Sequence, residues 1–245
     1  MELLEKQLDI TPGCADYKGR LGIYETFRAF MDMAAIHAEQ LGVGFEAMAA
    51  RGLFWLTVKT VVNFKKMPAM PETVTLRTWP EAPEKVRANR SYELIRDGET
   101  IITGKTEWAV INTQTKRLAP MRGIFDESVQ FGQTSACPEP FSRICDEFSE
   151  ADVTDTYRVR SIDIDVGGHM NNAAYVKALM GCFTTAELDE IEVSRMEVIF
   201  RAPCFEGDVL DIYRRSTDTG YSLKMTRDGE TVILAEMVSA RHLRS

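Results

Sequence analysis

A segment in the second half of the chain, residues 163–172 with sequence DIDVGGHMNN, gathers side chains suited to acid–base chemistry. Asp165 and His169 stand four residues apart, on either side of Gly167 and Gly168. A carboxylate or an imidazole can take a proton from water while the other group polarises or positions a carbonyl. The two glycines allow a sharp bend and a close approach of a substrate to the backbone. The segment therefore predicts a site for the attack of water on a carbonyl group.

The same segment leads into a predicted helix, for which Asn171 or Asn172 is a good N-cap. Backbone N–H groups at the start of a helix and near Gly167 to His169 can receive the oxygen that becomes negative when a carbonyl is attacked. Composition alone leaves a second interpretation open, in which Asp165 is a turn residue and His169 a solvated loop histidine. The sequence thus supplies a catalytic hypothesis and a structural alternative for the same residues.

Internal similarity indicates that the chain contains two copies of one unit. The pentapeptide RDGET occurs twice, each time between two strand-like runs and with the Asp-Gly pair of a hairpin turn. Three landmarks recur in the same order: residues 17–20 with 157–160, residues 63–65 with 199–201, and residues 96–100 with 227–231. In the first copy, residues 21–26 (LGIYET) are taken as the counterpart of the acidic segment. Since they enter a helix without a polar cluster, the fold does not require that cluster.

Each copy is expected to contain one helix followed by antiparallel strands, which is an α+β architecture. The first copy predicts a helix over 24–41 and strands near 54–64, 73–79, 86–96 and 100–112. The second copy predicts a short strand near 157–162, a helix through Tyr175, Leu179, Cys182, Phe183 and Ala186, and strands near 193–201, 208–215, 220–227 and 231–241. Residues 120–150 carry no sustained period. The expected organisation is an N-terminal unit at 1–122, a linker at 123–150 and a C-terminal unit at 151–245.

Composition limits the class of protein. The 245 residues carry a formal net charge of -8, which argues against nucleic acid as a partner because such binders are basic. The sequence has no apolar run long enough to cross a membrane and no signal-peptide pattern at its start, so a cytoplasmic protein is expected. The cysteines are five in number and lack metal-binding spacing, which predicts free thiols and no metal site.

The segment DIDVGGHMNNAAY at 163–175 resembles the active-site segment of hotdog-fold thioesterases. From about residue 4 to 242 the chain resembles the acyl-acyl-carrier-protein (acyl-ACP) thioesterases of plants and bacteria. The likeness includes HAEQLG at 37–42, WLT at 55–57, TWP at 78–80, EWAVIN at 107–112 and TKR at 115–117. It implies two tandem hotdog units, each an antiparallel sheet wrapped around a long helix, with one active site in the second unit.

The resemblance also implies particular site residues. The family motif D-x-N-x-H places its aspartate on Asp165 and its histidine on His169, while Gly167 occupies the asparagine position. The family also carries a glutamate followed by cysteine or serine on the next strand. In this chain Pro203 stands at the glutamate position and Cys204 at the cysteine position. Glu206, nearby in the sequence, is the candidate that replaces the glutamate. Single-unit hotdog thioesterases often lack the asparagine and work with the aspartate, which favours Asp165 among the candidates. The catalytic candidates are therefore Asp165, His169, Gly167, Cys204 and Glu206.

Several other residues have two interpretations. Cys204 is either a nucleophile with His169 as its base or, more in keeping with free cysteines, a buried apolar residue. His37 is interpreted as a helix-packing residue. The apolar residues of the first copy are mainly core, and some are expected to line the acyl-chain pocket that the family places there. A scatter of basic residues is a candidate landing place for an acidic carrier: Lys65, Lys66, Arg87, Arg90, Lys116 and Arg117.

The function that the resemblance implies is hydrolysis of fatty acyl-ACP to free fatty acid and carrier protein, without a metal or organic cofactor. Two alternatives stay open: an acyl-CoA thioesterase of the same fold, and a non-catalytic acyl-binding protein. The second is motivated by Gly167 and Pro203 at positions where the family has polar groups. Because the fused pair already supplies the partner that a single hotdog unit needs, both a monomer and a homodimer are compatible with the sequence.

Overall fold

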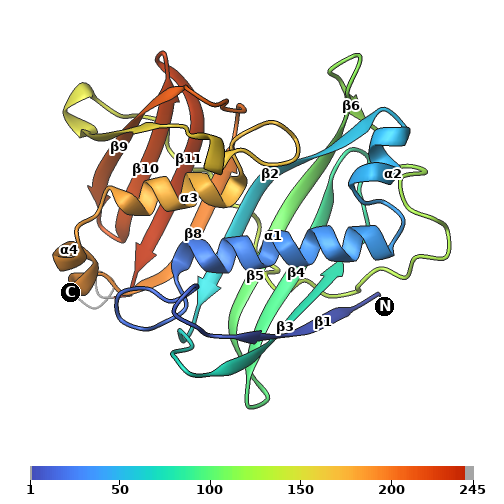
Figure 1. The fold of residues 1–245 in the computed structure, drawn as a ribbon, viewed down its shortest axis with the longest axis horizontal. Coiled ribbons are helices and arrows are strands. Elements are labelled where there is room, and N and C mark those ends of the chain that lie inside the picture. The colour runs from blue at the N-terminus through green and yellow to red at the C-terminus, as the bar shows by residue number, and fades with distance from the viewer. Residues whose placement is uncertain (1, 241–245) are drawn as a thin grey trace. The chain divides into compact units, whose positions relative to one another are not determined.

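The computed structural model describes residues 2–240 and divides into two compact units (Figure 1). The first unit comprises the chain up to Gly22 together with Arg28–Pro140, and the second comprises Ile23–Phe27 together with the chain from Phe141 onward. Each unit pairs a helix with an antiparallel sheet, as the α+β prediction requires.

In the first unit the helix α1 (Ile23–Gln40), whose residues from Arg28 onward belong to this unit, crosses one face of the antiparallel sheet (Figure 1). The strands lie in the order β1-β3-β4-β5-β2, and the two-residue β6 pairs with β5. The elements are β1 (Leu4–Asp9), α1 (Ile23–Gln40), α2 (Phe45–Ala50), β2 (Leu53–Phe64), β3 (Thr73–Pro80), β4 (Ala88–Arg96), β5 (Glu99–Asn112) and β6 (Leu118–Ala119).

The second unit repeats this plan. Its strands lie in the order β7-β9-β10-β11-β8, which matches the first unit strand for strand. The elements are η1 (Glu150–Asp152), β7 (Val153–Arg158), η2 (Ser161–Asp163), α3 (Asn172–Gly181), α4 (Thr185–Glu190), β8 (Val193–Phe200), β9 (Val209–Thr217), β10 (Gly220–Arg227) and β11 (Glu230–Ser239). The predicted duplication of one α+β unit, the hotdog architecture, is therefore confirmed.

The repeated pentapeptide forms the same turn in both units. Asp97 and Asp228 have φ values of 51° and 52°, and Gly98 and Gly229 both have φ of 80°. Two successive residues in the left-handed region make a type I′ turn, which joins β4 to β5 and β10 to β11. The Asp-Gly signal thus places both hairpins correctly.

Two predictions about the second unit were wrong. The strand expected near 157–162 is β7 at Val153–Arg158, and the single helix expected to reach Ala186 is two helices. The break has a local cause, because the Thr184 hydroxyl accepts a hydrogen bond from the Glu187 N–H while the Glu187 carboxylate accepts from the Thr184 N–H. This capping box starts a new helix, α4, and so ends the apolar periodicity of α3.

Helix α1 packs closely on its sheet through Phe30. The Phe30 ring stacks on Tyr92 of β4, with ring centroids 4.4 Å apart and an interplanar angle of 6°. A side chain at Gly104 of β5 would collide with Phe30, because an added Cβ would lie 2.2 Å from its ring. Glycine at this position therefore lets the helix approach the sheet.

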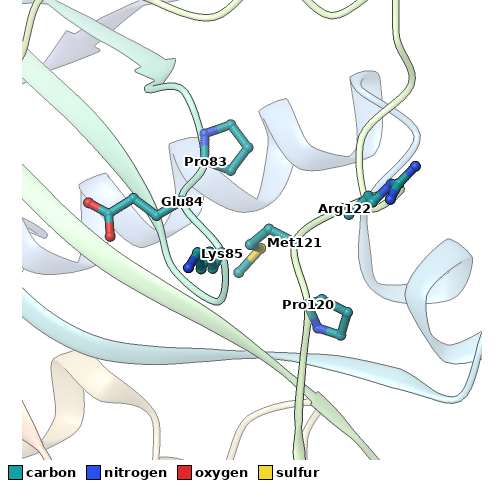
Figure 2. Close-up of a pocket in the computed structure, with 6 residues that line it drawn as sticks. All are labelled: Pro83, Glu84, Lys85, Pro120, Met121 and Arg122. Atoms are coloured by element: carbon teal, nitrogen blue, oxygen red, sulfur yellow. The ribbon is translucent and has the colours of Figure 1, made fainter.

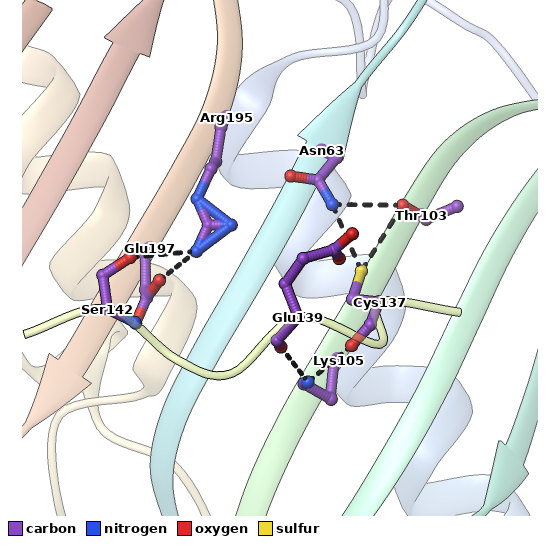
Figure 3. Close-up of polar contacts among 8 residues, drawn as sticks. All are labelled: Asn63, Thr103, Lys105, Cys137, Glu139, Ser142, Arg195 and Glu197. Atoms are coloured by element: carbon purple, nitrogen blue, oxygen red, sulfur yellow. Dashed lines mark hydrogen bonds and ion pairs between the residues drawn. The ribbon is translucent and has the colours of Figure 1, made fainter. Parts of the chain in front are cut away.

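The stretch between β6 and η1 has no helix or strand, yet buried charges hold parts of it to each unit (Figure 3). In the first unit the buried Lys105 Nζ donates to the carbonyl oxygens of Cys137 and Glu139, the second at 2.7 Å. In the second unit the fully buried Glu197 accepts from the Ser142 N–H at 2.8 Å and pairs with Arg195. The predicted linker thus contains docked segments.

Replacing Lys105 by methionine should lower the free energy of unfolding by about 1–3 kcal/mol, because two carbonyl groups lose a charged donor. Urea denaturation of the full chain measures this change. The control is Lys66→Met, which removes an exposed ion pair with Glu99 and should change stability by less than about 1 kcal/mol. Equal effects of the two substitutions would contradict the docking role of Lys105.

Candidate active site

Asp165 begins a tight turn just before α3. Its N–H donates to the His169 carbonyl oxygen at 2.9 Å, and its own carbonyl oxygen accepts from the Gly168 N–H at 3.0 Å. Its side-chain Oδ1 accepts from the Gly167 N–H at 2.8 Å. Gly168 has φ of 76°, a conformation that glycine adopts without strain. The turn therefore fixes the Asp165 carboxylate and brings the two ends of the D-x-x-x-H segment together through the backbone.

The first unit contains the same turn at residues 16–20. The Asp16 N–H donates to the Arg20 carbonyl oxygen, the Asp16 carbonyl oxygen accepts from the Gly19 N–H, and Gly19 has φ of 72°. The Lys18 N–H donates to the Asp16 Oδ1 at 2.9 Å, as Gly167 does to Asp165. Isolated bridges flank both turns, joining residue 15 to 21 and residue 164 to 170. The counterpart of the acidic segment is therefore 16–20. The match of that segment with residues 21–26 was wrong, and so was the match of residues 17–20 with 157–160.

The two turns differ in the residue that closes them. In the first unit Arg20 donates from Nη2 to the Asp16 Oδ2 at 3.0 Å and from Nε at 3.3 Å, which neutralises the carboxylate. In the second unit His169 occupies the equivalent position. Within residues 2–240, Asp165 forms no ion pair and its Oδ2 accepts no hydrogen bond. Asp165 is exposed, so this oxygen can meet water.

The amide groups of the turn have structural partners. Because the Gly167 and Gly168 N–H groups both donate to Asp165, neither is available to an oxyanion in this conformation. Helix α3 starts at the Asn171 N-cap, whose side chain accepts from the Ala173 N–H at 2.8 Å. Of the two N-caps considered from the sequence, Asn171 is the correct one. Gly167 thus contributes by shaping the acidic turn.

His169 lies against the loop that follows β8. Its ring centroid is 5.2 Å from that of Phe205, at an interplanar angle of 52°. The Met170 N–H donates to the Cys204 carbonyl oxygen at 2.8 Å, which ties the turn to this loop. Glu206 is exposed and follows Phe205 directly in the chain. The structure therefore joins the loop carrying Cys204 and Glu206 to the turn that carries His169.

Cys204 has the surroundings of a core residue. It is fully buried, its N–H donates to the Tyr175 hydroxyl at 2.9 Å, and burial raises the pKa of its thiol. Its backbone position has a counterpart in the first unit, where the Pro68 carbonyl oxygen accepts from the Leu21 N–H at 2.8 Å. A buried thiol with a raised pKa yields little thiolate, which is the nucleophilic form.

Cys204→Ala should accordingly retain thioester hydrolysis to within about tenfold, since loss of a true nucleophile costs on the order of 10⁶-fold in kcat. The measurement is kcat with an acyl thioester under saturating conditions. A loss of several orders of magnitude in a folded variant would instead make Cys204 a nucleophile. The Met70→Ala variant, which changes a partly exposed residue of the equivalent loop in the first unit, is the matched control.

Sequence reasoning missed two groups that support the turn. Asp163 is buried, and its Oδ2 accepts from the Tyr157 hydroxyl at 2.9 Å and from the Arg160 N–H at 2.8 Å. Burial, together with Asp163, raises the pKa of Tyr157 to about 12. Tyr175 of α3 supports the Cys204 loop in a similar way. Tyr175 is 29 residues from Cys204, so no local pattern marks that contact, and the six-residue spacing of Tyr157 and Asp163 matches no recurrent capping or turn motif.

The remaining candidates are placed as follows. All five cysteines are free, as predicted. Among residues 2–240 no cluster of three or more His, Cys, Asp or Glu side chains is arranged to hold a metal ion. Over the same range no helix combines the length and apolar character needed to span a membrane. Of the predicted basic scatter, Arg90 is buried and so cannot serve as a landing place, while Lys65 and Lys66 both pair with Glu99.

A pocket of about 380 Å³ lies in the first unit, outside the acidic turn (Figure 2). Its lining comes from the β3–β4 loop and from the segment after β6, and consists of Pro83, Glu84, Lys85, Pro120, Met121 and Arg122. Met121 is also a member of a buried apolar cluster that includes Ala88 and Val110. The pocket is therefore continuous with the core of the first unit at Met121.

Comparison with known proteins agrees with this arrangement. Residues 2–128 match the model for the acyl-ACP thioesterase N-terminal domain, and residues 147–237 match the model for the C-terminal domain. Among curated relatives, oleoyl-acyl carrier protein thioesterase 1 of Arabidopsis thaliana is 23% identical over 199 residues, covering 74% of this chain and 55% of the relative. The dodecanoyl-[acyl-carrier-protein] hydrolase of Cinnamomum camphora is 25% identical over 197 residues, covering 73% and 50%. The chain thus spans about half the length of the curated relatives it matches.

Solved structures share the fold over nearly the whole chain. An acyl-ACP thioesterase from Bacteroides thetaiotaomicron superposes with a TM-score of 0.83 at 22% identity, covering 97% of both chains. The 12:0-ACP thioesterase from Umbellularia californica gives a TM-score of 0.85 at 17% identity, again covering 97% of both chains. With both of its halves matched by the family's two domain models, the chain belongs to the acyl-ACP thioesterase family.

Proposed function

We propose that this chain hydrolyses fatty acyl-ACP to free fatty acid and carrier protein. The observation that carries the proposal is the contrast between its two equivalent turns. Asp16 is neutralised by Arg20, whereas Asp165 is exposed beside His169 and has a carboxylate oxygen open to water. Family membership supplies the substrate class, since the relatives named above act on acyl carrier proteins. The catalytic centre then lies in the C-terminal unit.

In the proposed reaction a water molecule attacks the thioester carbonyl carbon while the Asp165 carboxylate takes its proton. The new carbon–oxygen bond gives a tetrahedral intermediate, which collapses as the carbon–sulfur bond breaks. The proton passes from Asp165 to the leaving thiolate, so the carboxylate is regenerated. His169 positions and polarises the carbonyl, Gly167 shapes the turn, and Glu206 and Cys204 belong to the loop behind His169.

Neither a metal nor an organic cofactor enters these steps. The domain assignment proposed for the chain keeps the N-terminal unit at 1–122, the docked linker at 123–150 and the catalytic unit at 151–245. Five free cysteines suit a reducing compartment, which supports a cytoplasmic setting. The carrier protein is the proposed partner, and the chain is proposed to work as a monomer or homodimer.

The test is release of thiol from a series of acyl-ACP substrates, with the matching acyl-CoA series measured in parallel. The proposal requires turnover with a preference for the carrier protein over coenzyme A. A strong preference for coenzyme A would favour an acyl-CoA thioesterase. Binding of acyl chains without any thiol release would favour a non-catalytic acyl-binding protein, for which Gly167 and Pro203 are the motivating residues.

A further inference from the structure

The first unit buries a positive charge that has no anionic partner. Arg90 of β4 is only 6% exposed. Its Nη1 donates to the His37 Nδ1 at 3.0 Å and to the Thr78 hydroxyl at 3.3 Å. No carboxylate within residues 2–240 pairs with it. Burial lowers the pKa of this guanidinium, which reflects the cost of an uncompensated charge.

His37 does not add a second charge to this site. Burial first, and the nearby Arg90 second, lower the pKa of His37 to about 4, so the imidazole is neutral at physiological pH. A neutral ring can accept the hydrogen bond from Arg90 through Nδ1. The cluster therefore carries one net positive charge, from Arg90.

Two other buried polar groups near Arg90 make only poor contacts, Tyr92 with Trp108 and with Thr106. The Tyr92 hydroxyl and the Trp108 indole N–H are buried and make no hydrogen bond of acceptable geometry. Tyr92 is two residues from Arg90 and lies on the side of β4 that faces α1. Burial raises the pKa of the Tyr92 hydroxyl to about 12, although Arg90, Thr106 and Trp108 each lower it. Arginine and tryptophan side chains donate only, so the missing partner is an acceptor. A carboxylate supplies two acceptor oxygens and a negative charge.

An apolar region adjoins this cluster. Ala88 precedes Arg90 by two residues on the same face of β4 and belongs to the buried apolar cluster that includes Met48 and Met121. Met121 lines the pocket of about 380 Å³, where its side chain is directed toward the Lys85 loop (Figure 2). The surface pocket, the apolar cluster and the Arg90 cluster thus follow one another within the first unit. An anion suits the inner end, and the middle part is a packed apolar cluster, in which an alkyl chain takes a place only when flexible side chains such as Met48 and Met121 move aside.

We propose that Arg90, His37, Tyr92 and Trp108 form a carboxylate-binding site for an alkyl carboxylate whose chain lies in the apolar cluster toward Met121. Two sources share this chemistry: a free fatty acid, and an acyl thioester that carries a carboxylate at the far end of its chain. Binding of the carboxylate does not depend on catalysis. Only the statement that the free fatty acid is the product, or that the acyl thioester is a substrate, rests on the proposed function.

Binding of dodecanoate is compared with binding of dodecanol, which has the same chain without the charge. Tryptophan fluorescence and calorimetry report the affinity, and Trp108 is part of the site. The wild-type protein should bind dodecanoate at least about tenfold more tightly, as expected for a charge-assisted hydrogen bond in a buried site. Arg90→Met should bind the two ligands equally, and Arg90→Lys should keep part of the preference.

Arg87→Met is the matched control, since it removes a partly exposed arginine that pairs with Glu107. It should leave the preference for dodecanoate unchanged. Thermal unfolding of each variant shows that the protein is folded. The proposal is overturned if the wild type has no preference for dodecanoate, as it would if a buried water alone fills the cluster, or if Arg90→Met retains the preference.

The same measurement on Asp165→Asn separates this site from catalysis, because carboxylate binding should persist in a protein whose hydrolysis is strongly reduced. Two kinetic arms then identify the source. If the ligand is a free fatty acid, dodecanoate should inhibit the wild type and not Arg90→Met. If it is the far end of a substrate, the ratio of kcat/KM for dodecanedioyl over dodecanoyl thioesters should fall in Arg90→Met. Absence of both effects, together with absence of binding, would refute the site.

Discussion

Replacing Asp165 by asparagine is expected to lower kcat/KM for acyl-ACP hydrolysis by about 10³-fold, within the range of roughly 10²–10⁴ that a general base contributes. The asparagine side-chain oxygen can still accept the hydrogen bond from the Gly167 N–H, so the turn is preserved. Only the capacity to take a proton from water is lost. Steady-state thiol release measures the change, and circular dichroism verifies that the variant is folded.

The first unit provides a control of the same geometry. Asp16→Asn alters an aspartate in an equivalent turn, with the same backbone hydrogen bonds, and should leave kcat/KM unchanged. Similar losses of kcat/KM in Asp165→Asn and Asp16→Asn would mean that both substitutions lower activity by disturbing the folded structure. Retention of activity in Asp165→Asn would leave the proposed mechanism without its base.

His169→Arg is expected to produce the second-largest loss, about 10²-fold or more in kcat/KM. The reason is visible in the first unit, where Arg20 holds the Asp16 carboxylate through two donors. An arginine at position 169 should form the same ion pair with Asp165. The variant therefore removes the imidazole and also neutralises the acid, while keeping a residue that the turn is known to accommodate.

His169→Gln separates these two effects, because glutamine removes the imidazole without supplying a cation. If Asp165 is the base, His169→Arg must be less active than His169→Gln. Equal activities of His169→Arg and His169→Gln would show that pairing the Asp165 carboxylate with a cation does not lower activity, which contradicts its role as the base. Arg20→His, the reciprocal change in the first unit, should leave hydrolysis unaffected.

The sequence alone determined the duplicated fold. Alternating apolar residues in 54–64 and the helical spacing in 24–41 depend on contacts within each element, and both elements form as predicted. The Asp-Gly hairpins are also local, and so is the asparagine N-cap of α3, although only the structure selects Asn171 over Asn172. The motif carrying Asp165 and His169 could be found for the same reason.

Tertiary structure decided which parts of the repeat are equivalent and what each charge does. The hydrogen bonds that identify Asp16 as the counterpart of Asp165 mostly connect backbone groups, and the Asp-x-x-Gly spacing that the two turns share is too short a pattern to mark them in the sequence. Arg90 reads in the sequence as one more surface cation, and only the packing of α1 on β3 and β4 buries it beside His37 and Thr78. Burial depends on contacts between distant segments, and it changes the chemistry of a side chain without changing its identity.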